Sequence, residues 1–133
     1  MIPPFEDNGY LPPGVHRATL DEIEARFGSE SELRRVQMES LRWLVDLARR
    51  AGVERLVIDG SFVADIFEPN DVDCVLLIAP DDPHDAAALD EIADGLPFLD
   101  LQLVEHIDFT MLVDQFFATD RYWTPKGLVE AIL

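Results

Sequence analysis

The sequence predicts an α+β (α/β-type) fold in which a small mixed β-sheet is backed by helices. Two observations lead to this class. Apolar residues recur close to the helical period over residues 33–48, whereas residues 71–78 are rich in β-branched side chains and flanked by turn formers. These segments share a chain of 133 residues, the size of one ordinary domain. Helices and strands mixed in this way favour one small sheet with helices packed against it.

The N-terminal part is expected to be an arm followed by a short helix. Residues 1–18 are rich in Pro and Gly, so we expect an extended arm there and a single domain over residues 19–133. Residues 19–22, Thr-Leu-Asp-Glu, form a capping-box pattern that opens a short helix, and Gly28 can end it.

A longer second helix is predicted to run to about Arg50. Ser29 or Ser31 can cap its start, and Gly52 follows as a stop signal. Its predicted apolar stripe comprises Leu33, Val36, Leu41, Leu44, Val45 and Ala48.

The rest of the chain alternates between strands and helices. Strands are predicted over residues 54–59, 71–78, 97–105 and 124–133. Helical segments are predicted over residues 62–66, 84–94 and 108–117, and a Gly-Ser turn follows the first of these strands.

The charge balance argues against several classes of partner. There are 10 Lys and Arg against 27 Asp and Glu, a net charge of -17, so we do not expect nucleic acid to bind. No apolar run approaches the ~20 residues of a membrane span, and the N-terminus lacks the pattern of a secretory signal. The single cysteine, Cys74, suits a reducing compartment, so we expect a cytoplasmic location.

Paired carboxylates on a predicted strand are the main chemical feature. Asp71 and Asp73 share one face of a strand because side chains alternate. Asp100 lies on the third predicted strand and joins them if the two strands are neighbours; Glu105, at that strand's end, is the fallback. Converging carboxylates repel one another, and divalent cations such as Mg²⁺ remove the conflict.

A turn suited to phosphate lies just upstream. Gly60 permits close approach of the backbone to a phosphate, and the hydroxyl of Ser61 can hold phosphate oxygens. In the acidic second half of the chain the only cations are Arg121 and Lys126, which are candidates for neutralising a triphosphate. Asp59, just before the turn, is expected to be an acid on an edge strand; the alternative is a hydrogen-bond partner of the site.

Gly60-Ser61, Asp71-Val72-Asp73 and a later strand acid together resemble the DNA polymerase β-like nucleotidyltransferase superfamily, especially its minimal members. The resemblance covers residues 54–105. It implies that Asp71, Asp73 and Asp100 bind two Mg²⁺ ions, with Mn²⁺ as the substitute, and that Gly60 and Ser61 grip a nucleoside triphosphate. Residues 8–16 also resemble the start of a small uncharacterised bacterial branch of this superfamily.

Two functions follow as expectations. The first is an enzyme, a nucleotidyltransferase that moves a nucleoside monophosphate onto an acceptor hydroxyl of a protein or small molecule. The alternative is a non-catalytic antitoxin or regulatory partner on the same fold, as in toxin-antitoxin pairs. Residues 60–65, Gly-Ser-Phe-Val-Ala-Asp, lack the Arg and second Gly that many antitoxins of this type carry after the turn. A protein partner or a homodimer fits either function.

Overall fold

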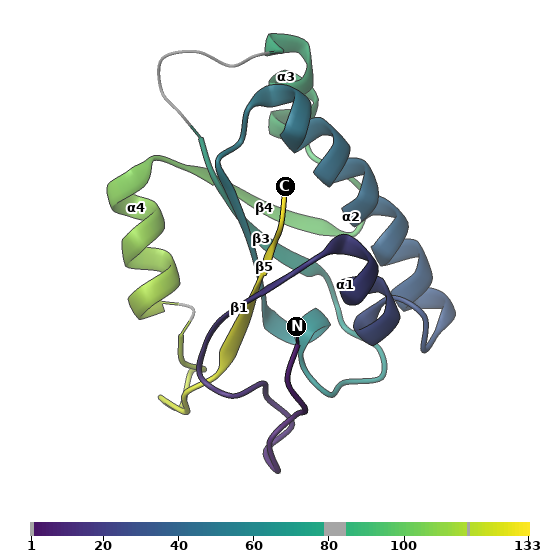
Figure 1. Ribbon diagram of the computed structural model, residues 1–133, viewed down its shortest axis with the longest axis vertical. Helices are drawn as coiled ribbons and strands as arrows, with labels where there is room; N and C mark the ends of the chain where they lie inside the picture. The colour runs from purple at the N-terminus through teal and green to yellow at the C-terminus, as the bar shows by residue number, and fades with distance from the viewer. Residues whose placement is uncertain (1, 79–84, 117) are drawn as a thin grey trace.

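The computed structural model describes residues 2–78, 85–116 and 118–133 and contains one five-stranded sheet with helices on both faces (Figure 1). The strands are β1 (Gly14–Ala18), β2 (Arg55–Asp59), β3 (Val72–Leu77), β4 (Leu99–Val104) and β5 (Gly127–Ala131). Their order is β1-β5-β2-β3-β4. The pairs β1–β5 and β3–β4 are parallel, while β2 runs antiparallel to both of its neighbours. The predicted α+β class with a small mixed sheet is therefore confirmed.

The helices are α1 (Leu20–Phe27), α2 (Glu32–Ala51), the short 3₁₀ helix η1 (Gly60–Val63), α3 (Ala86–Asp94), α4 (His106–Met111) and the π-helical turn η2 (Leu112–Phe116). Helices α1 and α2 begin and end at the expected signals, whereas the predicted helical segments at 62–66 and 108–117 have other bounds in the structure. Thr19 and Glu22 form the expected capping box of α1. Ser31 caps α2, which ends where Gly52 adopts a left-handed φ of 77°.

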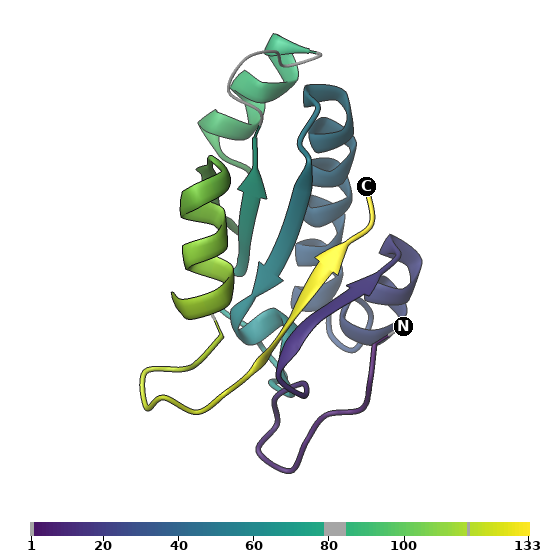
Figure 2. The ribbon, with the colours of Figure 1, turned by 60° about the vertical axis from the view of Figure 1, so that its left-hand side comes forward.

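The two faces of the sheet are covered unequally. Helices α1, α2 and α3 pack on one face, and α4 packs on the other (Figures 1 and 2). The first face carries the larger core, to which α2 contributes Met38, Leu41, Leu44, Val45, Leu47 and Ala48. The second face carries a smaller core of Val57, Val75, Leu77, Phe109, Val113 and Leu128. Part of the second face is thus left uncovered by α4.

The expected N-terminal arm needs a correction, because its last part is a strand of the sheet. Gly14–Ala18 is β1 and pairs with β5 in parallel register. Leu11 is fully buried, and its carbonyl accepts a hydrogen bond from the backbone N–H of Gly127. A Pro- and Gly-rich composition indicates turns but cannot show that the C-terminal strand supplies a partner. In the described part of the chain, no helix has the length and apolar character needed to cross a bilayer.

Candidate active site

Three aspartates lie side by side across neighbouring strands. Asp73 on β3 stands opposite Asp59 in the antiparallel pair with β2. It also stands opposite Asp100 in the parallel pair with β4. Directly opposed residues of adjacent strands present their side chains on the same face, so we call Asp59, Asp73 and Asp100 the acidic row. Asp71 precedes Asp73 by two residues and is exposed on the same face. The predicted adjacency of Asp73 and Asp100 is confirmed.

Alternation along each strand explains why the row lies where it does. Asp59 and Asp73 are each two residues from a member of the smaller core, Val57 and Val75, so they share the face covered by α4. Lys126, two residues before Leu128, joins the same face. The acidic row therefore lies on the same face as the smaller core under α4, directly beside it.

Burial decreases from the centre of the sheet outward. Asp59 is buried, Asp73 is partly buried, and Asp71 and Asp100 are exposed. Burial, followed by the charges of Asp59, Asp100 and Asp71, raises the pKa of Asp73 to about 6 against the opposing effect of Lys126. A carboxylate that is crowded in this way has excess negative charge around it and favours a cation.

The Gly60 turn packs directly on Asp73. Gly60 begins η1 with a φ of +79°, a left-handed conformation that glycine adopts at little cost. A β-carbon at this position would overlap Oδ2 of Asp73. The missing side chain thus makes room for the carboxylate of Asp73, and the turn and the predicted metal ligand form one unit. Ser61 follows in η1 and is partly exposed.

Lys126 is the cation closest to the row. Its Nζ lies 2.8 Å from Oδ1 of Asp59, with side chains only 15% and 5% exposed. The contact is ionic, since Oδ1 of Asp59 has no hydrogen-bond partner among the described residues. The interpretation of Asp59 as an acid on an edge strand is wrong, because β2 lies between β5 and β3 in the interior of the sheet. Asp59 does lie beside the site, as the alternative required, although its contact with Lys126 is an ion pair rather than a hydrogen bond.

Arg121 lies farther out than Lys126. It is exposed on the loop between η2 and β5, and its guanidinium carbon stands 5.3 Å from the ring centroid of Tyr122. Among the described residues the guanidinium of Arg121 lies against that ring and forms no ion pair with the acidic row. The structure therefore brings Asp71, Asp73, Asp100, Gly60, Ser61 and Lys126 to one end of the sheet and leaves Arg121 on a neighbouring loop.

Arg34 holds the Gly60 turn in place, a role that the sequence alone did not predict. The guanidinium of this α2 residue is buried and donates hydrogen bonds to the carbonyls of Phe27, Phe62, Ala64 and Ile66. The apolar stripe expected on α2 is partly wrong here, since Val36 is exposed while Arg34 and Gln37 are buried. An arginine beside an apolar stripe is more often a surface residue, so only the carbonyls that surround it reveal its role.

The donor set suits a hard divalent cation, although the described residues do not form a complete cage for one. In the described ranges, no group of three or more Asp, Glu, His or Cys side chains is arranged to hold a metal ion. Mg²⁺ nevertheless commonly takes one or two carboxylates and completes its shell with water and substrate phosphates. The crowded carboxylate of Asp73 and its register neighbour Asp100 provide such oxygen donors. The residues therefore fit Mg²⁺ in chemistry, with phosphate oxygens needed to complete the coordination.

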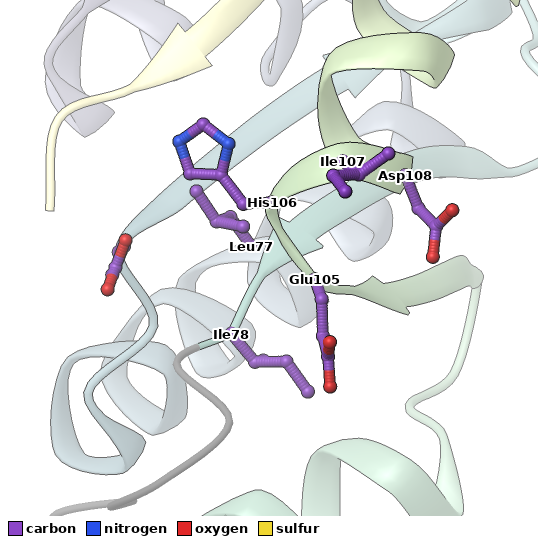
Figure 3. A pocket seen from close by; sticks show the side chains of 7 residues that line it. Leu77, Ile78, Glu105, His106, Ile107 and Asp108 are labelled. Carbon is purple, nitrogen blue, oxygen red and sulfur yellow. The ribbon is translucent and has the colours of Figure 1, made fainter.

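A separate hollow opens at the other end of the same strands. It has a volume of about 480 Å³ and is lined by Glu54, Leu77, Ile78, Glu105, His106, Ile107 and Asp108 (Figure 3). Glu54 precedes β2, whereas Asp59 ends it, so the hollow and the acidic row lie a strand length apart. Glu105, the fallback for the third acid, lines this hollow and is remote from Asp73.

Comparison with known proteins identifies a family without an assigned function. Residues 3–132 match DUF6932, described as a family of unknown function, and the chain belongs to it. Comparison with curated proteins and with solved structures produced no match.

Proposed function

We propose that this DUF6932 protein is a divalent-metal-dependent nucleotidyltransferase. It would move a nucleoside monophosphate from a nucleoside triphosphate to an acceptor hydroxyl on a protein or small molecule and release pyrophosphate. The observation that supports this most is the register of Asp73 with Asp100, together with the packing of Gly60 on Asp73. These are the motif elements whose spacing resembles that of the DNA polymerase β-like superfamily, and they meet at one end of the sheet.

Each residue of the site has a distinct task in this proposal. Asp71, Asp73 and Asp100 supply carboxylate oxygens for Mg²⁺, and the bound ions would neutralise charge on the triphosphate. Ser61 offers a partly exposed hydroxyl to phosphate oxygens at the turn. Lys126 adds a positive charge on the same face, held in place by Asp59. Arg121 is suited to the outer part of a bound nucleotide because it lies on the adjacent loop.

The reaction exchanges one phosphorus–oxygen bond for another. The acceptor oxygen forms a bond to the α-phosphorus, the bond from that phosphorus to the bridging oxygen of pyrophosphate breaks, and the hydroxyl proton leaves for a base. Asp100, exposed beside Asp73, would help to activate the acceptor, either as a metal ligand or as the base that accepts that proton. Lys126 counters negative charge that moves onto the leaving pyrophosphate. Positioning and charge neutralisation would provide most of the rate enhancement.

Thermal unfolding with ligands tests the proposal. Mg²⁺ together with at least one nucleoside triphosphate should raise the melting temperature, because a ligand that binds only the folded chain stabilises it, by about 2.7 kcal/mol at a concentration of 100 Kd. Asp73→Asn should abolish that shift. Asp90→Asn, an exposed aspartate on α3 at the opposite face, is the matched control and should keep it. If no nucleoside triphosphate shifts the wild-type protein, the enzyme proposal fails.

One feature favours the second candidate, a non-catalytic partner protein. On α4, Ile107 is 80% exposed and Met111 is 54% exposed, one helical turn apart and next to the acids Asp108 and Asp114. An apolar stripe with an acidic rim suits a basic partner surface. This candidate expects a basic partner to bind wild type and Asp73→Asn equally and to be lost with Ile107→Asp. Dependence of that binding on Asp73 would count against it.

A further inference from the structure

The loop that precedes Lys126 carries two exposed aromatic side chains. Tyr122 is 75% exposed and Trp123 is 82% exposed, and both lie between η2 and β5. This loop lies at the same end of the sheet as η1 (Figure 2). Large aromatic side chains contribute most to stability when they are buried, so these two rings contribute little to the folded chain itself.

Residues 118–126 of this loop are held by several hydrogen bonds. Oδ1 of Asp120 accepts hydrogen bonds from the backbone N–H groups of Tyr122 (2.8 Å) and Thr124 (3.0 Å). Its Oδ2 accepts one from the hydroxyl of Tyr10 at 2.8 Å. The N–H of Lys126 donates to the carbonyl of Ala118, which closes the base of the loop. These hydrogen bonds hold the backbone that carries both rings. The same backbone leads to Lys126, whose ammonium group pairs with Asp59 of the acidic row.

Trp123 also has a backbone conformation that disfavours it. Its φ of 65° lies in the left-handed region, where a bulky residue is uncommon and costs of order 1 kcal/mol or more. Neither burial nor local hydrogen bonding of its ring offsets this cost in the described structure. Strain of this kind in a fixed loop beside a charged site indicates a functional use of the side chain.

We infer that Trp123, with Tyr122 beside it, is the platform on which the base of the bound nucleoside triphosphate stacks. This inference rests on the proposed function. Lys126 would hold the phosphate end, while the rings, three and four residues earlier on the same frame, meet the base. The guanidinium carbon of Arg121 lies 5.3 Å from the centroid of the Tyr122 ring, a cation–π contact that helps to hold this ring in place. Stacking recognises any base, so this platform gives affinity with little choice among nucleotides.

Fluorescence of Trp123 tests the inference directly. The chain has one other tryptophan, Trp43 on α2, so Trp43→Phe leaves Trp123 as the sole reporter. With Mg²⁺ present, a nucleoside triphosphate should quench its emission saturably, and inorganic tripolyphosphate, which has no base, should bind without quenching. Trp123→Ala should weaken nucleotide binding by roughly 5- to 150-fold and leave tripolyphosphate binding unchanged. Trp43→Ala is the matched control, a partly exposed tryptophan on the opposite face.

A second variant keeps the test informative if alanine disturbs the loop. Trp123→Gly relieves the left-handed strain, so it should raise the melting temperature of the free protein while still weakening nucleotide binding. If nucleotide and tripolyphosphate both bind but Trp123 is neither quenched nor needed, the platform is wrong and the proposed function stands. Equal weakening of both ligands by Trp123→Gly would also overturn the platform. If neither ligand binds the wild-type protein, both proposals fall.

Discussion

The α-carbon of Gly60 packs against the carboxylate of Asp73, so that any side chain at position 60 would overlap Oδ2 of that aspartate. This contact joins the turn after β2 to the first residues of β3. It makes the backbone of the Gly-Ser turn and the acidic row mutually dependent, because neither can move without displacing the other.

Gly60→Ala is therefore expected to destabilise the protein for two reasons. The methyl group conflicts with the φ of +79°, and it also meets Asp73. We expect a loss of roughly 2–4 kcal/mol in the free energy of unfolding, measured in urea. Gly95→Ala separates the two causes, because Gly95 has a φ of +93° with nothing within 4 Å of its β-carbon position. If Gly95→Ala costs as much as Gly60→Ala, the contact with Asp73 is not responsible.

Asp73→Asn is expected to stabilise the unliganded protein above neutral pH. Asp59, Asp71, Asp100 and Lys126 face this carboxyl, whose folded pKa of about 6 exceeds the unfolded value near 3.9. Since the folded state binds the proton more tightly, stability falls as the pH rises from about 4 to 6 and stays lower above. The asparagine variant should gain roughly 1–3 kcal/mol at pH 8 and almost nothing at pH 4.

Urea unfolding at pH 4, 6 and 8 measures that difference. Asp90→Asn is the control, and its change in the free energy of unfolding should be the same at all three pH values. An equal gain at pH 4 and pH 8 would show that ionisation of Asp73 is not the cause. Adding Mg²⁺ should reduce the gain at pH 8, because the ion binds the ionised carboxylate of the wild type.

Lys126→Met should be strongly destabilising, because it leaves the buried carboxylate of Asp59 without its counter-charge. Removing one partner of a buried ion pair costs about 3–5 kcal/mol. The double variant Asp59→Asn/Lys126→Met should recover much of this loss, since no charge is then left alone. A double-mutant cycle from urea unfolding gives the coupling energy. Additive losses in that cycle would mean that the pair does not interact as the geometry indicates.

Arg34→Met is expected to loosen the turn from a distance. The change removes the donors of four buried or partly buried backbone carbonyls, three of them in the segment that follows Ser61. We expect a loss of at least about 3 kcal/mol in stability and faster hydrogen exchange of the amides in residues 62–66. Arg35→Met is the matched control, because that neighbour is exposed and makes one 3.4 Å hydrogen bond to a carbonyl. A similar loss in both variants would contradict the structural role of Arg34.

Local signals in the sequence sufficed for the caps of α1 and α2 and for four of the five strands. The capping residues Thr19 and Ser31 and the stop at Gly52 act over a few residues, so their outcome could be predicted from neighbouring residues alone. Alternation likewise gave Asp71, just before β3, and Asp73 one face, and it brought Asp100 to them on condition that the two strands are neighbours.

Only the tertiary structure decided which distant segments meet. The pairing of β1 with β5 converted a Pro- and Gly-rich stretch into a strand, and the central position of β2 buried Asp59 beside Lys126. The burial of Arg34 depends on carbonyls up to 32 residues away. Strand partners and the partners of buried charges are set by long-range packing and desolvation, which have no counterpart in a short window of sequence.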